Sequence, residues 1–351
     1  MQPISLNNGA EIWTYLEKQL QDLSIRMTLK KHEKYNLKKL FRNAYQKELV
    51  SEGSKNNTFP IFIEPTSESK RLTNFFMKRL LPSWTIKGEE NLLKAFDHHL
   101  KGGRVIFMLN HTNLADSPIF DYLLDNFLKN NYSRTKIKHL KKAMVWIASI
   151  RAYGNPFVSM FSKCSNIATV FNRRNINQAQ QKAQEAQEES EKETWQQKFS
   201  AMLGHNINAI KAVAKYRFIP LIFIEGTCRY VNLLHRGDPA AANIPKLINA
   251  TKEGCDNTLI VTCFLEGVGK ALDSSVLTDV EDKLYHFLEV FNLNNDGCLH
   301  IGEPILWNEI VSSVPRQERV EHEQLLVDYI MGKLMAPLAP ESARGYYSSY
   351  N

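Results

Sequence analysis

The hydrophobic pattern alternates between short, continuous apolar runs and longer stretches in which apolar residues recur every three or four positions. The short runs predict buried strands, and they cover residues 84–88, 105–109, 167–171, 218–224, 259–265 and, more weakly, 299–306. The longer stretches predict amphipathic helices, and they cover residues 68–81, 89–100, 119–130 and 199–216. Because predicted strands and helices alternate, we expect an α/β fold with a mixed central sheet flanked by helices.

The pattern also suggests how the chain is divided. Helical periodicity at residues 12–23 and 37–45, followed by a polar linker at 51–57, predicts a small N-terminal helical domain over residues 1–80. We expect the α/β domain over residues 81–335 and a C-terminal tail over 336–351, of which the polar residues 341–351 are disordered or loosely attached. Residues 178–198, rich in Gln, Glu and Lys, predict a solvated helix or a partly disordered insertion.

The run at 105–109 ends in the feature on which the functional prediction depends. The order of strand 84–88, helix 89–100 and strand 105–109 predicts a βαβ unit. A polar turn then contains His111, and Asp116 lies where the next helix opens. Both residues therefore lie where a strand is followed by a helix, at the edge of an α/β sheet where ligands bind.

The spacing of this pair has a chemical meaning. Four intervening residues can bring the carboxylate of Asp116 back to the imidazole of His111 across one turn. A carboxylate on one ring nitrogen fixes the tautomer and makes the other nitrogen a better base. That nitrogen could take a proton from a substrate hydroxyl that attacks an acyl carbonyl. Taken alone, the same pair could also be a polar loop with a capping Asp.

Polar and basic residues follow the later strands in the same way. Arg173 and Arg174 follow the strand at 167–171 and could hold a phosphate. Glu225 and Gly226 follow the most apolar strand, and a glycine there lets the backbone approach a ligand. The positively charged candidates downstream of that strand are Arg229, His235 and Arg236.

Composition narrows the classes of protein. The chain has 351 residues, 43% of them hydrophobic, and a net charge of +7, which suits phosphate-bearing substrates, an acidic carrier protein or an anionic membrane surface. It carries no basic tract interleaved with aromatics, which argues against nucleic acid. Five scattered cysteines without a Cys-x-x-Cys pair argue against a structural zinc site and for a reducing compartment. The apolar runs are too short to span a bilayer.

Four segments in a fixed order carry a family resemblance. They are Asn110-His111-x-x-x-x-Asp116, the Phe-Asn-Arg-Arg run at 171–174, the Phe-Ile-Glu-Gly-Thr run at 223–227, and the late strand at 259–265. This set resembles the glycerolipid His-x4-Asp acyltransferase family over roughly residues 80–305. The plan with a helical domain first is similar to its soluble, chloroplast-type glycerol-3-phosphate acyltransferases. In this chain Cys228 separates Thr227 from Arg229, which makes Arg236 an alternative phosphate ligand.

The resemblance implies the fold of that family and a reaction. A fatty acyl group would pass from acyl carrier protein or coenzyme A to sn-glycerol 3-phosphate, with His111 as general base and Asp116 orienting it. The residues implied or suggested for substrate binding are Asn110, Arg173, Arg174, Glu225, Gly226, Thr227, Arg229, His235 and Arg236. We expect no metal and no cofactor beyond the acyl thioester co-substrate. We also expect a cytoplasmic protein, peripheral on an anionic membrane, or a stromal one.

Three other readings remain open at this point. The acceptor could be 1-acylglycerol 3-phosphate or another lysophospholipid. The chain could be a non-catalytic, membrane-surface lipid-binding protein, although such a protein has no need of the His111–Asp116 pair. A hydrolase could use the same pair with Ser117 or a metal, but the sequence has no Gly-x-Ser-x-Gly elbow.

Overall fold

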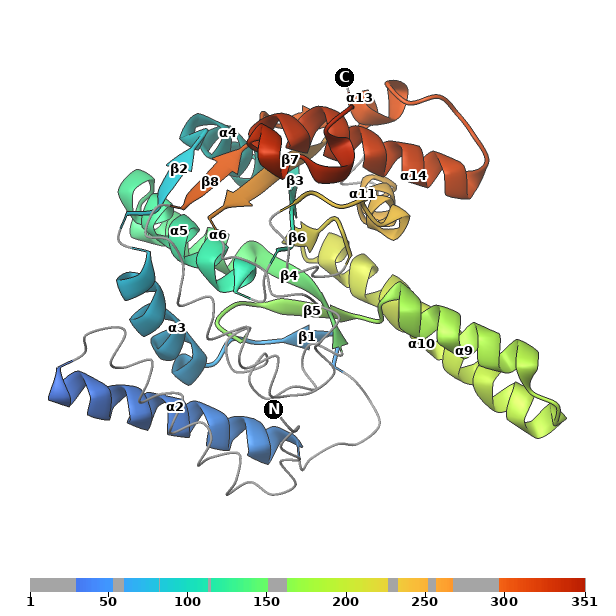
Figure 1. Ribbon diagram of the computed structural model, residues 1–351, viewed down its shortest axis with the longest axis horizontal. Coiled ribbons are helices and arrows are strands. Elements are labelled where there is room, and N and C mark those ends of the chain that lie inside the picture. Colours follow the sequence, from blue (N-terminus) through green and yellow to red (C-terminus); the bar gives the residue numbers. More distant parts are fainter. Residues whose placement is uncertain are drawn as a thin grey trace.

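The structure is a computed structural model, and it describes residues 30–52, 60–81, 83–112, 115–150, 163–226, 233–251, 257–267 and 297–350 (Figure 1). The predicted N-terminal periodicity at 12–23 and most of the predicted linker at 51–57 lie outside these residues.

A nine-stranded, mostly parallel sheet forms the centre of the molecule, with the order β1-β5-β4-β6-β3-β7-β8-β2 and with β9 paired to β7. The strands are β1 (Phe62–Ile63), β2 (Thr85–Lys87), β3 (Arg104–Leu109), β4 (Met144–Ser149), β5 (Ile167–Val170), β6 (Ile219–Phe223), β7 (Thr258–Glu266), β8 (Cys298–Ile301) and β9 (Ile305–Leu306). The five central strands from β5 to β7 are parallel. Strand β1 is antiparallel to β5, both β8 and β9 are antiparallel to β7, and β2 is parallel to β8. The predicted α/β fold with a mixed sheet is confirmed.

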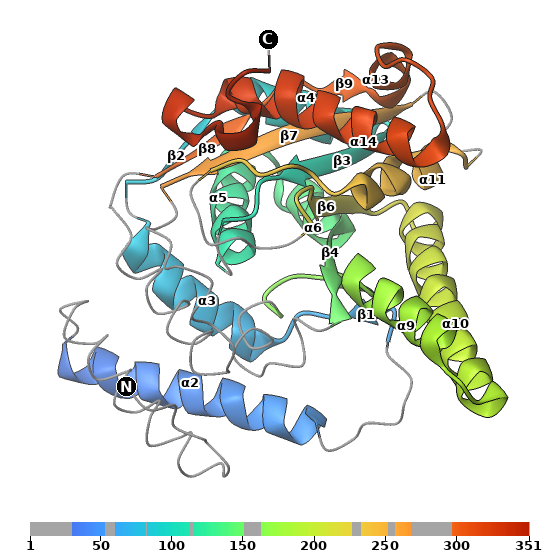
Figure 2. The same cartoon turned by 45° about the vertical axis from the view of Figure 1, so that its right-hand side comes forward.

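Helices cover both faces of this sheet (Figures 1 and 2). Those of the described residues are α2 (Lys31–Glu52), α3 (Ser67–Leu80), α4 (Glu89–Leu100), α5 (Asp116–Asn131), α6 (Arg134–Ala143), α9 (Arg173–Glu185), α10 (Glu189–Lys215), α11 (Asn243–Asn249), α13 (Trp307–Ser312) and α14 (Arg319–Tyr329). Val105, Phe107 and Leu109 of β3 pack with α3 to α6, while Ile106 and Met108 pack with α10, α11, α13 and α14. Every residue of β3 is buried, which explains its continuous apolar run.

The strand order creates a switch point between β3 and β6. The chain leaves β3 toward α5, on the first face of the sheet. It leaves β6 toward Ile224, Leu234 and α11, which pack on the other face. In α/β sheets, ligands bind at the carboxyl ends of adjacent parallel strands whose connections leave to opposite faces. The residues after β3 and β6 meet at this switch point.

One topological prediction is wrong. Strand β2, helix α4 and strand β3 do follow one another, but β7 and β8 lie between β2 and β3. Because β2 is parallel to β8, and β8 is antiparallel to β7, which is parallel to β3, the strands β2 and β3 run in opposite directions. They therefore do not form a βαβ unit. An apolar run reports that a strand is buried, but it carries no information on the direction of its partner.

The tail prediction is also wrong for the residues that the structure describes. Residues 336–347 form short 3₁₀ turns, and Ala343 and Tyr347 are buried. The Tyr347 hydroxyl donates to Asp328 Oδ1 at 2.8 Å and accepts from the Gly237 amide at 3.0 Å. Near the other end, β1 joins the sheet and α3 joins the core, so residues 62–80 of the predicted helical domain share that core.

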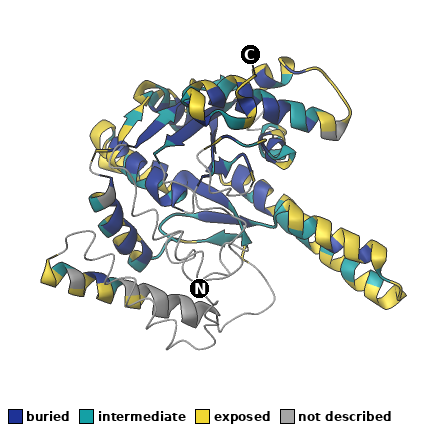
Figure 3. Cartoon of the chain, in the orientation of Figure 1, coloured by how far each residue is buried: buried dark blue, intermediate teal, exposed yellow. Residues whose placement is uncertain are grey.

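The Gln- and Glu-rich segment is helical. Helices α9 and α10 pack along each other and extend away from the sheet, with mostly exposed residues (Figures 2 and 3). The helix expected at 199–216 is the second half of α10. A solvated helix was therefore the better of the two predictions for this segment.

Buried His99 makes the stability of the fold depend on pH. Burial, and then His139 and Arg217, lower the pKa of His99 to about 4. In the unfolded chain, His99 has its ordinary pKa of 6.5. Below pH 6.5 the unfolded chain therefore binds a proton on His99 that the folded chain does not bind, and the stability of the fold falls as the pH falls. Because of His99, the free energy of unfolding should be about 2 kcal/mol lower at pH 5 than at pH 7.

Urea unfolding at pH 7 and pH 5 measures this dependence. His99→Leu should lose less stability between the two pH values than the wild type, and exposed His32→Leu should behave like the wild type. An equal loss in all three proteins would contradict the assignment to His99.

Candidate active site

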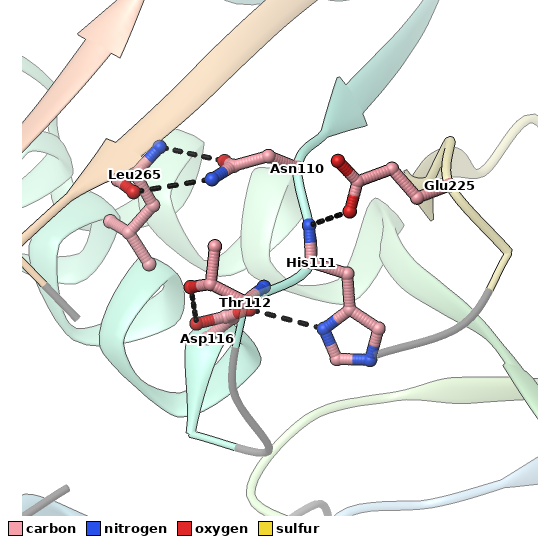
Figure 4. Close-up of polar contacts among 6 residues, drawn as sticks. All are labelled: Asn110, His111, Thr112, Asp116, Glu225 and Leu265. Carbon is pink, nitrogen blue, oxygen red and sulfur yellow. Dashed lines mark hydrogen bonds and ion pairs between the residues drawn. The ribbon is translucent and has the colours of Figure 1, made fainter. Parts of the chain in front are cut away.

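The register of the sheet brings together residues that are far apart in the sequence. Leu109 of β3 lies opposite Phe223 of β6 and opposite Cys263 of β7. Two positions beyond Leu109 and Phe223, His111 lies beside Glu225, and the intervening Asn110 lies beside Leu265 (Figure 4). The Asn110 side chain donates to Leu265 O at 3.2 Å and accepts from Leu265 N at 2.8 Å. Asn110 is buried, so its amide extends the pairing of β3 with β7 rather than facing a ligand.

The His111–Asp116 pair forms as the spacing predicts. His111 Nδ1 lies 3.0 Å from Asp116 Oδ2, and because an ionised carboxylate can only accept, Nδ1–H is the donor. The Nε2 atom then carries the lone pair, and it points away from Asp116 (Figure 4). The side chain of His111 is 16% exposed and that of Asp116 is 1% exposed. The carboxylate is therefore shielded, while the imidazole reaches solvent.

Thr112 holds the carboxylate in place. Its amide donates to Asp116 Oδ2 at 2.7 Å, and its hydroxyl donates to Oδ1 at 3.3 Å. Asp116 is the first residue of α5, where a negative charge is favoured by the helix dipole. The turn between β3 and α5 thus fixes the acceptor before any ligand arrives.

Glu225 connects the loop after β3 to the loop after β6 through hydrogen bonds. Its Oε2 accepts from the His111 amide at 3.1 Å, and its Oε1 accepts from the His235 amide at 3.0 Å. Glu225 is only 5% exposed. Next to it, Gly226 has a φ of +71°, and a Cβ there would lie 2.8 Å from Asp238 Oδ2 and 2.9 Å from Asp238 Cβ. The left-handed backbone conformation and the close approach of Asp238 therefore both favour glycine at position 226.

The imidazole of His111 is the outer member of a stack of three rings, followed by Phe223 and Trp146. The His111 ring lies on the Phe223 ring with centroids 3.8 Å apart and an angle of 10° between the planes. Phe223 in turn stacks on Trp146 at 4.9 Å. The Trp146 indole donates to both oxygens of Asp121 at 3.1 Å. The ring plane of His111 is thus set by β6, β4 and α5 together.

The two arginines after β5 lie at the start of α9, where Asn172 caps the helix. Both are exposed. Arg173 Nη1 lies 3.7 Å from Asp238 Oδ1, and Asp238 contacts the Gly226 position. The structure therefore links Arg173 to the loop that carries Glu225. Thr227 and Arg229, which sequence analysis also singled out, lie outside the described residues.

The residues proposed further along the loop have other contacts. Arg236 pairs with Asp328 at 3.3 Å and lies 5.7 Å from the Tyr346 ring. His235 contributes its amide to Glu225. To bind a substrate phosphate, Arg236 would have to give up its ion pair with Asp328.

Sequence reasoning missed three contributors to this site. Thr112 was only part of the polar turn, Phe223 was only an apolar strand residue, and Asp238 carried no signal at all. The position of Thr112 within the turn could have suggested a partner for Asp116. The roles of Phe223 and Asp238 depend on strand order and loop packing, which no local pattern reports.

The fold and the site together define an α/β protein with a His–carboxylate pair at the carboxyl edge of a mostly parallel sheet. No family model matches the chain, and no curated protein matches it. Within the described part of the chain, no group of three His, Cys, Asp or Glu side chains could hold a metal ion. No helix of that part combines the length and apolar character needed to cross a membrane.

Proposed function

We propose that this protein is an acyltransferase that moves a fatty acyl group from a carrier-protein or coenzyme A thioester to sn-glycerol 3-phosphate, giving lysophosphatidic acid. The observation that carries the proposal is the His111–Asp116 pair. A base with a shielded carboxylate on Nδ1 and an outward Nε2 lies at the switch point of the sheet. The ordered motifs that resemble glycerolipid acyltransferases, and the fold of that family, are part of the same proposal.

The proposed reaction needs no protein nucleophile. His111 Nε2 takes the proton of the glycerol hydroxyl as its oxygen attacks the thioester carbonyl. The carbon–oxygen bond forms, the carbon–sulfur bond breaks as the tetrahedral intermediate collapses, and the proton passes from the imidazolium to the leaving thiolate. Asp116 stabilises the imidazolium in between. The product is an ester and a free thiol, so atoms and charges balance.

A thioester-release assay tests the function. Purified protein receives palmitoyl-coenzyme A or palmitoyl carrier protein, with and without glycerol 3-phosphate. Thiol release that depends on the acceptor would support the proposal. Release without acceptor would indicate a hydrolase, and release only with lysophosphatidate would move the acceptor to a lysophospholipid. No release with any acceptor would favour the lipid-binding protein instead.

The arginines at the start of α9 give a prediction about the acceptor. Arg173→Ala and Arg174→Ala should each raise the KM for glycerol 3-phosphate by about tenfold or more, because a charge-assisted contact to phosphate contributes roughly 1.5–3 kcal/mol. The KM for the acyl donor should stay unchanged. Arg316→Ala, at an exposed arginine in the loop before α14, is the control for loss of positive charge. An unchanged acceptor KM in both variants would remove these arginines from the site.

A further inference from the structure

A second feature of the structure is a cavity of about 680 Å³ between α3, α5, α6 and the beginning of β4. These elements lie on the same face of the sheet as Phe223 and Trp146 (Figures 1 and 2). Its apolar lining includes Pro118, Met144, Trp146 and Leu221. Its polar lining comes mainly from α3, α5, α6 and residues 164–166.

The wall from α6 is strongly basic. Arg134, Lys138, Lys141 and Lys142 line the cavity, and their spacing places them along one side of the helix. Lys70 of α3 adds a further cation. Helix α6 has no acidic residue. The cations therefore extend over about 12 Å of helix, given a rise of about 1.5 Å per residue.

Most of this positive charge is not neutralised by the protein. Asp125 pairs with Lys141 at 2.5 Å and with Lys129 at 2.8 Å. Asp121 accepts hydrogen bonds from Trp146 and Ser165. Within the part of the chain that the structure describes, no carboxylate pairs with Lys70, Arg134, Lys138 or Lys142. Glu64 is the remaining acidic residue among the described residues of the lining.

The apolar end of the cavity adjoins the candidate active site. Pro118 is two residues from Asp116. Trp146, which lines the cavity, stacks on Phe223 at 4.9 Å, and Phe223 stacks on the His111 ring at 3.8 Å. A ligand with its anionic end at α6 and an apolar arm along Trp146 would thus extend toward the base.

We infer that this cavity binds the phosphopantetheine arm of the acyl donor, with its phosphate on Arg134, Lys138 and Lys142 and its thioester end toward His111. This inference rests on the proposed function, because that function supplies the donor. The basic residues of the cavity complement the phosphate of this arm, its apolar residues complement the methyl and methylene groups, and Thr73, Asn74 and Asn166 can bond its amides. Coenzyme A and a carrier protein both present this arm, so the experiment uses both.

Equilibrium binding tests the inference without any turnover. Isothermal titration with coenzyme A, and separately with holo-carrier protein, is compared between wild type and the double variant Arg134→Glu/Lys138→Glu. The dissociation constant should rise by about tenfold or more in the double variant, because charge-assisted contacts are replaced by repulsion. Lys136→Glu is the matched control, since Lys136 is an exposed cation of the same helix that is not among the residues lining the cavity.

The outcomes separate this inference from the proposed function. Weaker binding of both ligands in the double variant alone supports a site for the shared arm. Weaker binding of the carrier protein alone, or an equal effect of Lys136→Glu, overturns it in favour of general charge attraction. If neither ligand binds the wild type, the inference is also overturned. Acyl transfer that depends on His111 but has the same donor KM in the double variant overturns this inference and leaves the proposed function intact.

Discussion

His111→Ala should lower acceptor-dependent acyl transfer by about a thousandfold, because a general base contributes roughly 10²–10⁴ to the rate of such a step. The loss should appear in kcat, since the imidazole acts on the reacting hydroxyl rather than on the phosphate. The thioester-release assay with glycerol 3-phosphate measures it. The fold should survive, because the carboxylate of Asp116 keeps both of its bonds to Thr112.

The chain offers a matched control for this variant. His300 Nε2 lies 2.7 Å from Glu266 Oε2, and the His300 side chain is 14% exposed, close to the 16% of His111. This second His–carboxylate pair belongs to β8 and β7, on the side of β3 opposite to β6. His300→Ala should therefore keep near wild-type activity. A His111→Ala protein as active as His300→Ala would refute the proposed mechanism.

Asp116→Ala should cost nearly as much activity as the loss of the base, whereas Asp116→Asn should cost less. Asp116 Oδ2 accepts from both His111 Nδ1 and the Thr112 amide. An asparagine oxygen at that position can accept both bonds, and its NH₂ group can face the Thr112 hydroxyl. The tautomer is then kept and only the charge is lost, so we expect a loss of about 30- to 100-fold in kcat, equivalent to roughly 2–3 kcal/mol. Steady-state kinetics of both variants measures the difference.

The alanine variant should also be less stable. It leaves the buried Thr112 amide without its acceptor, at a cost of about 1–3 kcal/mol. Urea unfolding checks this cost. Thr112→Val, which removes only the 3.3 Å hydroxyl bond, should change activity by a few-fold at most. If Asp116→Asn retained the wild-type kcat, the charge of Asp116 would have no part in the reaction.

The local elements could be predicted well because their signals are local. The runs at 105–109 and 218–224 appear as β3 and β6 within one residue at either end. The helix expected after the polar turn begins at Asp116. The His111–Asp116 contact was also predictable, since it closes a single turn whose geometry depends on few intervening residues.

The arrangement of the elements could not be predicted in the same way. The direction of β2 and the packing of Tyr347 were predicted wrongly, since both depend on partners distant in sequence. The sequence suggested a solvated helix or a disordered insertion over 178–198 and a second helix over 199–216, whereas the structure places the break between α9 and α10 at residues 186–188. A polar, Gln-rich pattern has no apolar stripe that would mark where one helix ends.

The sequence by itself indicated most of the buried strands, although not β4, together with the helix that follows β3 and the turn across which an imidazole and a carboxylate can meet. Only the tertiary structure decided that β3 lies between β6 and β7, which places Glu225 beside His111 and the Phe223 ring beneath its imidazole. The physical reason lies in the parallel sheet. Its central strands are buried on both faces, so their apolar runs carry no alternation that names a neighbour or a register.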